Sequence, residues 1–72
     1  MAESVYKVIE LIGTSSDSWE AAAANAVTMA AKTVKDIRIA EVTEMDVVVS
    51  DGKISAYRTK LNISFKVHEK VD

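Results

Sequence analysis

Two long extended segments, residues 37–50 and 53–68, are separated only by Asp51-Gly52. An Asp-Gly pair between two β-branched, apolar runs predicts a hairpin with a two-residue turn. Sixteen extended residues span about 50 Å, whereas the one helical segment, residues 17–35, is about 28 Å long. Because one helix of that length cannot cover the hairpin, the sequence predicts that other copies of the chain cover the rest.

The length of the chain also favours self-association. Seventy-two residues predict one domain, residues 1–72, and a domain of this size is marginally stable without reinforcement. The sequence has no cysteine, which excludes disulfides and thiolate metal sites as that reinforcement. Contacts between identical subunits remain as the expected source of stability.

The charge pattern argues against nucleic-acid and membrane partners. The net charge is −2, and no basic stripe is interleaved with aromatic residues as a nucleic-acid surface requires. No apolar stretch approaches the roughly 18 residues that cross a bilayer, and the first residues lack the basic start and apolar run of a secretory signal. We therefore expect a cytoplasmic protein.

The first half of the chain predicts a strand followed by a helix. Residues 4–12 carry apolar side chains on both faces, which predicts a strand covered on both sides and ended by Gly13. Ser16 or Asp17 is expected to cap the helix, and Asp17 with Glu20 has capping-box spacing. One helix face is apolar and carries Trp19, Ala22, Ala23, Ala26, Val27, Ala30 and Val34.

The alternation in residues 53–68 predicts a strand with one apolar face, which carries Tyr57, Leu61, Ile63, Phe65 and Val67. A two-residue turn pairs Ser50 with Lys53, so Leu61 faces Val42 beneath the helix. Ile63 faces Ala40 in the same register. The opposite face is expected to pair Ile39, Glu41, Thr43 and Met45 with Ser64, Asn62, Lys60 and Arg58.

The sequence offers no catalytic constellation. One histidine, no cysteine and no nucleophile–base spacing exclude acyl-transfer triads and zinc sites, so we expect no enzyme. His68 is expected to lie in a solvated tail. We expect Trp19 to serve core packing or to cap the neighbouring strands, rather than to bind a ligand.

The remaining candidates lie on the polar face of the hairpin. Arg58 is expected to form an ion pair with Glu41, Glu44 or Asp46 across a subunit contact, with binding of an anionic ligand as the alternative. Ile39 is expected to fill a subunit contact. Calcium requires six to eight oxygen ligands, so these three acidic residues would form a calcium site only when symmetry brings several copies together.

Three motifs together resemble the dodecin family. They are the opening Val5-Tyr6-Lys7…Glu10-Leu11-Ile12-Gly13-Thr14-Ser15, the helix start Trp19-Glu20-Ala21-Ala22, and the closing Leu61…Phe65-Lys66-Val67. The resemblance covers about residues 4–68. It implies an α+β fold in β-α-β-β order, with a three-stranded antiparallel sheet wrapped around one helix. It also implies assembly into a hollow homododecamer.

The resemblance places the family's flavin pocket at Ile39 and Arg58. Typical dodecins sandwich a flavin ring on a tryptophan of the second strand and bind it with a glutamine of the third, in pockets between subunits. Here these positions hold Ile39 and Arg58, so a π face and an amide acceptor are both absent. The same replacements resemble the calcium dodecins, although no calcium ligand maps onto this chain.

The sequence therefore predicts a non-enzymatic protein that binds or stores a small ligand in a dodecameric shell without stacking a flavin. A calcium- or anion-binding assembly and a structural oligomer without a specific ligand remain as alternatives. The chemical identity of the ligand stays open.

Overall fold

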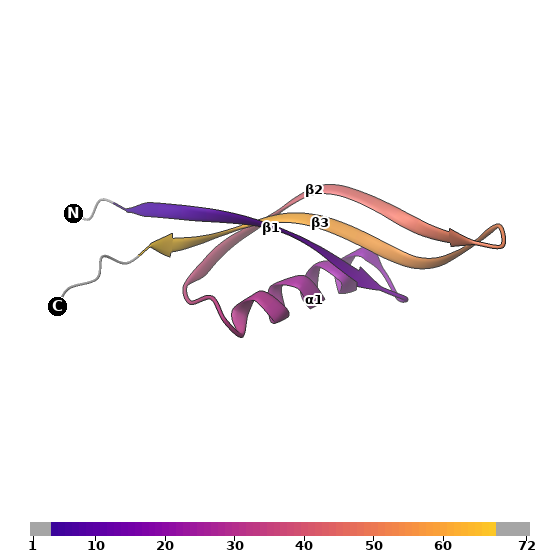
Figure 1. Ribbon diagram of the computed structural model, residues 1–72, viewed down its shortest axis with the longest axis horizontal. Coiled ribbons are helices and arrows are strands. Elements are labelled where there is room, and N and C mark those ends of the chain that lie inside the picture. Colours follow the sequence, from indigo (N-terminus) through magenta and orange to yellow (C-terminus); the bar gives the residue numbers. More distant parts are fainter. Residues whose placement is uncertain (1–3, 68–72) are drawn as a thin grey trace.

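The computed structural model describes residues 4–67 and contains one helix and three strands. Strand β1 (Val5–Ser15) is followed by helix α1 (Trp19–Ala31), and strands β2 (Ile37–Ser50) and β3 (Lys53–Val67) form the long hairpin (Figure 1). The three strands form one antiparallel sheet in the order β1-β3-β2. The predicted β-α-β-β fold is confirmed, as are the bounds of the second strand.

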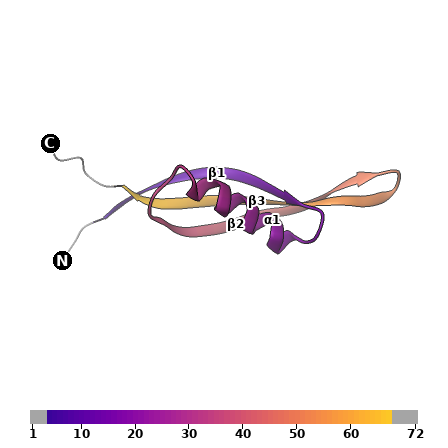
Figure 2. The same ribbon diagram turned by 90° about the horizontal axis from the view of Figure 1, so that it is seen from below.

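The core lies between α1 and the central strand β3. The helix packs across one face of the sheet (Figures 1 and 2), where Ala26 and Ala30 contact the buried side chains of Leu61 and Ile63. Ile9 and Leu11 of β1 pack against the same cluster. Because the buried helix residues are alanines, the helix lies close to the sheet but contributes little apolar volume.

Gly13 does not end the first strand, as the sequence had predicted, but lies inside it. The strand continues to Ser15 and pairs with β3 without a register shift along its whole length. A Cβ atom at Gly13 would collide with the carbonyl oxygen of Ala22 and would lie 3.1 Å from the Cβ of Ala26. The glycine is therefore the place where the helix backbone approaches the sheet, rather than a strand terminator.

The helix is shorter than predicted at both ends. Ser18, and not Ser16 or Asp17, is the N-cap, and its hydroxyl accepts a hydrogen bond of 3.0 Å from the amide of Ala21. At the other end the helix stops at Ala31, and the chain turns through Asp36, which has a φ of 62°. The carbonyl of Asp36 accepts from the amide of Lys66 at 3.1 Å, which returns the chain to the sheet.

The turn of the hairpin has the predicted form. Asp51 and Gly52 both have positive φ, at 53° and 72°, as a two-residue hairpin turn requires. Ser50 pairs with Lys53 as predicted. The predicted pairs Val42–Leu61 and Ala40–Ile63 are also confirmed.

Between these confirmed pairs the register is shifted by one residue. Thr43 is an extra residue in β2, so Glu44 pairs with Lys60, and Asp46 pairs with Arg58. The prediction that Thr43 and Met45 would face these two basic residues is therefore wrong. A β-bulge reverses the facing of the residues that follow it, and here it places two carboxylates beside two cations.

One subunit leaves much apolar surface exposed. On the face of the sheet that points away from α1, here called the outer face, Tyr6, Val8 and Ile12 of β1 are exposed. The prediction that the first strand is covered on both sides is therefore not met within a single chain. Within residues 4–67, no helix is long and apolar enough to cross a bilayer.

Candidate ligand-binding face

The two positions predicted for the ligand pocket both lie on the outer face but far apart. Ile39 pairs with Ser64 of β3, six residues along that strand from Arg58, a separation of about 20 Å. The side chain of Ile39 is 63% exposed. A single chain therefore does not bring Ile39 and Arg58 together, and a pocket that uses both would need more than one subunit.

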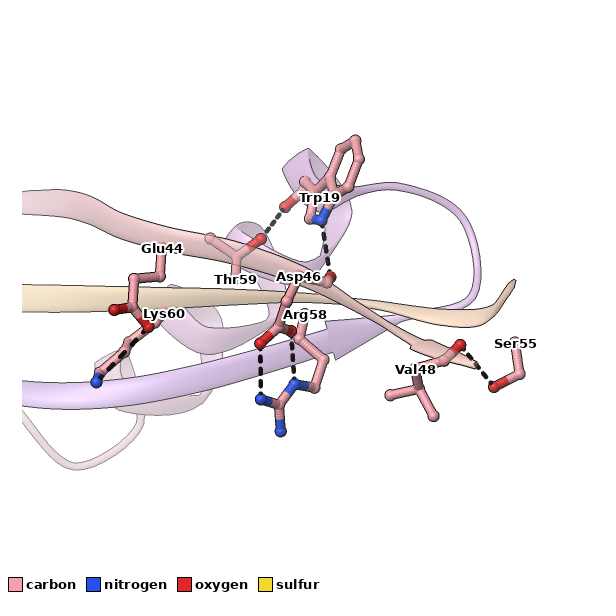
Figure 3. A network of polar contacts seen from close by, with 8 residues as sticks. All are labelled: Trp19, Glu44, Asp46, Val48, Ser55, Arg58, Thr59 and Lys60. Carbon is pink, nitrogen blue, oxygen red and sulfur yellow. Dashed lines mark hydrogen bonds and ion pairs between the residues drawn. The ribbon is translucent and has the colours of Figure 1, made fainter. Parts of the chain in front are cut away.

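Arg58 forms a bidentate ion pair with Asp46 (Figure 3). Its Nε donates to Oδ1 of Asp46 at 2.7 Å, and its Nη2 donates to Oδ2 at 2.8 Å. This parallel pair of hydrogen bonds is the strongest geometry between guanidinium and carboxylate groups. Asp46 is one of the three partners predicted for Arg58, so the ion pair is confirmed. The pair forms within one chain, however, and not across a subunit contact as predicted.

The pair shifts the titration of both groups. The hydrogen bonds from Arg58 lower the pKa of the Asp46 carboxyl below its ordinary value of 3.8, against a smaller opposing effect of burial. The hydrogen bonds to Asp46 likewise raise the pKa of Arg58. Both residues therefore remain charged across the physiological pH range, and the Arg58 guanidinium is paired with the Asp46 carboxylate of its own chain.

The positive charge of Lys60 likewise lies near acidic side chains on both neighbouring strands. Its Nζ lies 3.5 Å from Oε2 of Glu10 on β1 and 4.0 Å from Oε1 of Glu44 on β2 (Figure 3 shows the contact with Glu44). These exposed pairs are weak. Arg58 and Lys60 of the central strand nevertheless each have an acidic partner, so neither offers an unpaired positive charge to an anionic ligand.

The acidic residues do not form a metal site within one chain. Among residues 4–67, no three histidine, cysteine or acidic side chains lie close enough together to hold a metal ion. Asp46 is engaged by Arg58, and Glu44 lies beside Lys60. Calcium binding on this face would therefore require oxygen ligands from further subunits.

Trp19 caps the strands from the opposite side of the sheet, as one of the predicted alternatives stated. Its indole N–H donates to the carbonyl oxygen of Asp46 at 3.0 Å (Figure 3). Its ring packs edge-on against Tyr57 with centroids 5.1 Å apart. Its own carbonyl oxygen accepts from the buried hydroxyl of Thr59 at 2.9 Å. Helix and hairpin are thus joined at Trp19.

Sequence reasoning missed the two partners in this joint. Thr59 interrupts the apolar face of the third strand, and a polar residue at such a position was a usable signal for a buried hydrogen bond. Asp46 serves both sides of the sheet, because its carboxylate holds Arg58 while its carbonyl oxygen holds Trp19.

His68 lies outside the described residues, so its predicted place in a solvated tail is not tested.

The comparisons with known proteins agree with this geometry. The sequence profile of the dodecin family matches residues 5–68. The chain is 60% identical over 65 residues to a protein named calcium dodecin from Mycobacterium tuberculosis, covering 89% of this chain and 90% of the relative. It is 34% identical over 65 residues to the dodecin of Thermus thermophilus, with coverages of 90% and 94%.

Solved structures give the same answer. The dodecin of Streptomyces coelicolor superposes with a TM-score of 0.91 at 33% identity, covering 97% of this chain and all of the other. The structure of calcium dodecin from Mycobacterium tuberculosis, described as a calcium-chelating antigen with a novel calcium-binding site, gives a TM-score of 0.81 at 50% identity and covers 94% of this chain. The profile match over most of the chain, the two sequence relatives and the superpositions assign the protein to the dodecin family.

Proposed function

We propose that the protein is a non-enzymatic binding and storage protein whose subunits assemble into a homododecameric shell. The single observation that carries this proposal is the exposed apolar surface of the isolated subunit, on the outer face and along the end of the hairpin. Large apolar side chains that one chain leaves exposed on one face favour contacts with other chains. Family membership supports the dodecamer as the form that these contacts take.

A stacked flavin is disfavoured as the ligand. Ile39 has no π face, so the stacking that adds about 0.5–1.5 kcal/mol per aromatic pair is absent. Arg58 has no acceptor atom and already donates two hydrogen bonds to Asp46. Both side chains thus differ from those that bind a neutral flavin edge in the typical family member.

Calcium is the ligand that we favour, at contacts between subunits. The relative that is 60% identical over most of the chain is named calcium dodecin, and calcium is what that name assigns to the relative. In this chain Glu41, Glu44 and Asp46 follow the outer face of one strand. Carboxylates from neighbouring copies would supply the remaining oxygen ligands that calcium needs.

Native mass spectrometry tests assembly and ligand together. Particles are measured as purified, after dialysis against calcium chloride, and after incubation with riboflavin. We expect the mass of a dodecamer that retains calcium but not riboflavin. A folded monomer would contradict the assembly, and a particle that retains riboflavin without calcium would contradict the choice of ligand.

A pair of matched variants locates the ion. Glu44→Gln removes a carboxylate from the outer face, whereas Glu20→Gln removes one from the helix. We expect Glu44→Gln to lower the calcium content of an intact particle and Glu20→Gln to leave the calcium content unchanged. Equal calcium content in both variants would exclude Glu44 from the site.

A further inference from the structure

Asp46 is bound from both sides of the sheet (Figure 3). Its carbonyl oxygen accepts a hydrogen bond of 3.0 Å from the indole N–H of Trp19, the first residue of α1. On the outer face its carboxylate accepts two hydrogen bonds from Arg58, at 2.7 and 2.8 Å. A contact made by the helix therefore fixes the backbone of the residue that occupies the guanidinium on the other side.

Two further hydrogen bonds support this arrangement. The hydroxyl of Thr43, the extra residue of the bulge, donates to the carbonyl oxygen of Lys60 at 3.2 Å. The hydroxyl of Thr59 donates to the carbonyl oxygen of Trp19 at 2.9 Å, which anchors Trp19 to the central strand. The Asp46 carboxylate is therefore positioned before any ligand arrives, and its pairing with Arg58 requires little further ordering.

The carboxylate opposes the binding of anions at Arg58 by occupancy and by charge. It uses the edge of the guanidinium, Nε and Nη2, that receives a carboxylate or a phosphate in a bidentate contact. An anion at the remaining donors would lie within a Debye length of Asp46, about 8–10 Å, and would be repelled. A carboxylate of the same chain also competes at an effective concentration on the order of millimolar or above.

We propose that Asp46 determines which class of ligand the outer face accepts, because it acts as a built-in counter-ion that excludes phosphates and carboxylates from Arg58. Trp19 is its positioning residue. The side chains of Arg58 and Asp46 are 41% and 50% exposed, so an anion reaches Arg58 once the charge of Asp46 is removed. The inference rests on the proposed function, since it takes the outer face as the ligand-binding surface.

Riboflavin phosphate is the probe for this test, and riboflavin is its uncharged counterpart. The fluorescence anisotropy of each is measured at low salt with assembled wild type, Asp46→Asn and Glu41→Gln. Both substitutions remove one negative charge from the outer face, but Glu41 has no ion pair within residues 4–67. We expect Asp46→Asn to bind riboflavin phosphate about 5-fold more tightly than Glu41→Gln, the upper end for an exposed ion pair. Riboflavin should not distinguish the two variants.

Asp46→Asn combined with Arg58→Gln identifies the cation that the phosphate uses. We expect the double variant to lose the gain in affinity, because no guanidinium remains at this position. Light scattering shows that each particle is intact. A double variant that keeps the gain overturns the proposed role of Asp46. An Asp46→Asn particle that binds riboflavin phosphate no more tightly than the Glu41→Gln particle overturns it as well.

A second pair of variants leaves Asp46 in place and tests Trp19. Trp19→Phe keeps an aromatic ring beside Tyr57 but removes the N–H that Asp46 accepts from. Tyr57→Phe keeps the ring contact and that hydrogen bond. We expect Trp19→Phe to bind riboflavin phosphate about 2-fold more tightly than Tyr57→Phe, a part of the effect of removing the pair. Arg58→Gln should abolish this gain too. Equal affinities of Trp19→Phe and Tyr57→Phe overturn the positioning role.

The calcium content of the wild-type particle separates this inference from the proposed function. A particle without calcium whose Asp46→Asn variant gains riboflavin phosphate overturns calcium as the ligand and supports the role of Asp46. A particle that retains calcium but whose Asp46→Asn variant shows no gain overturns the role of Asp46 alone.

Discussion

Neighbouring residues of the central strand face opposite sides of the sheet, and this alternation decides what each substitution removes. Leu61 and Ile63 are 1% and 0% exposed beneath α1, whereas Asn62 between them lies on the outer face. The polar residue Thr59 occupies a buried position because its hydroxyl donates to Trp19. The role of each side chain thus follows from the side of the sheet to which it points.

The first prediction compares two adjacent residues. Leu61→Ala should lower the free energy of unfolding by about 2–5 kcal/mol, because it leaves a cavity against α1. Asn62→Ala should change it by less than about 1 kcal/mol, as expected away from the core. Guanidinium titrations at one fixed protomer concentration measure both, and equal losses would show that the facing is wrong.

The second prediction concerns the pH dependence of the Asp46–Arg58 pair. The lowered pKa of Asp46 means that its contribution to stability is present above its ordinary value of 3.8 and is lost as the pH falls through the lower value of the folded state. The stability difference between wild type and Asp46→Asn should therefore shrink below pH 3.8.

Glu41→Gln is the control for this experiment, because it removes a carboxylate of the same face that has no ion pair within residues 4–67. Thermal unfolding of the three proteins across the acid range gives the comparison. A difference between wild type and Asp46→Asn that stays constant down to the lowest pH would contradict the ion pair.

At the scale of the elements, local patterns predicted the strands better than the helix. The alternation in residues 53–68 and the Asp51-Gly52 pair specified the hairpin, because side-chain period and turn chemistry agree there. The helix was predicted too long, because the capping residues Ser16, Asp17 and Ser18 stand in a row and local spacing does not distinguish them. In the structure Ser18 is the residue that caps the helix.

The one-residue bulge at Thr43 was beyond sequence reasoning. The residues around it, Val42-Thr43-Glu44, contain no glycine or proline that would mark a bulge. The consequence for the candidate site is large, since the bulge brings Asp46 rather than Met45 to Arg58. The acidic partner of Arg58 was anticipated from charge alone, but its place within the same chain was not.

The third prediction tests the close approach of helix and sheet. Gly13→Ala places a methyl group against the carbonyl of Ala22, and the backbone must move to admit it. Such overpacking should cost about 1–3 kcal/mol. Gly52→Asn is the control, because that site is open and asparagine tolerates its φ of 72°. A Gly13→Ala variant as stable as Gly52→Asn would contradict the packing.

At the scale of the whole molecule, one subunit is an incomplete unit. Its helix covers only part of one face of the sheet, and the described chain places Ile39 and Arg58 about 20 Å apart. A pocket that includes both positions therefore exists only where two or more subunits meet. Under the proposed function, assembly and ligand binding are therefore a single property, and a variant designed to change the ligand is tested in the assembled particle.

The last prediction is that two substitutions on the outer face create a flavin-binding site. Wild-type protein should quench riboflavin fluorescence little, whereas Ile39→Trp with Arg58→Gln should quench it strongly, because the pair restores a stacking surface and an amide with both donor and acceptor. Arg58→Gln alone should not quench, since it supplies no π face. Light scattering on each variant shows that the particle is intact. Strong quenching by the wild type would contradict our interpretation of Ile39. Quenching by riboflavin phosphate that salt abolishes would instead identify an electrostatic site for an anion.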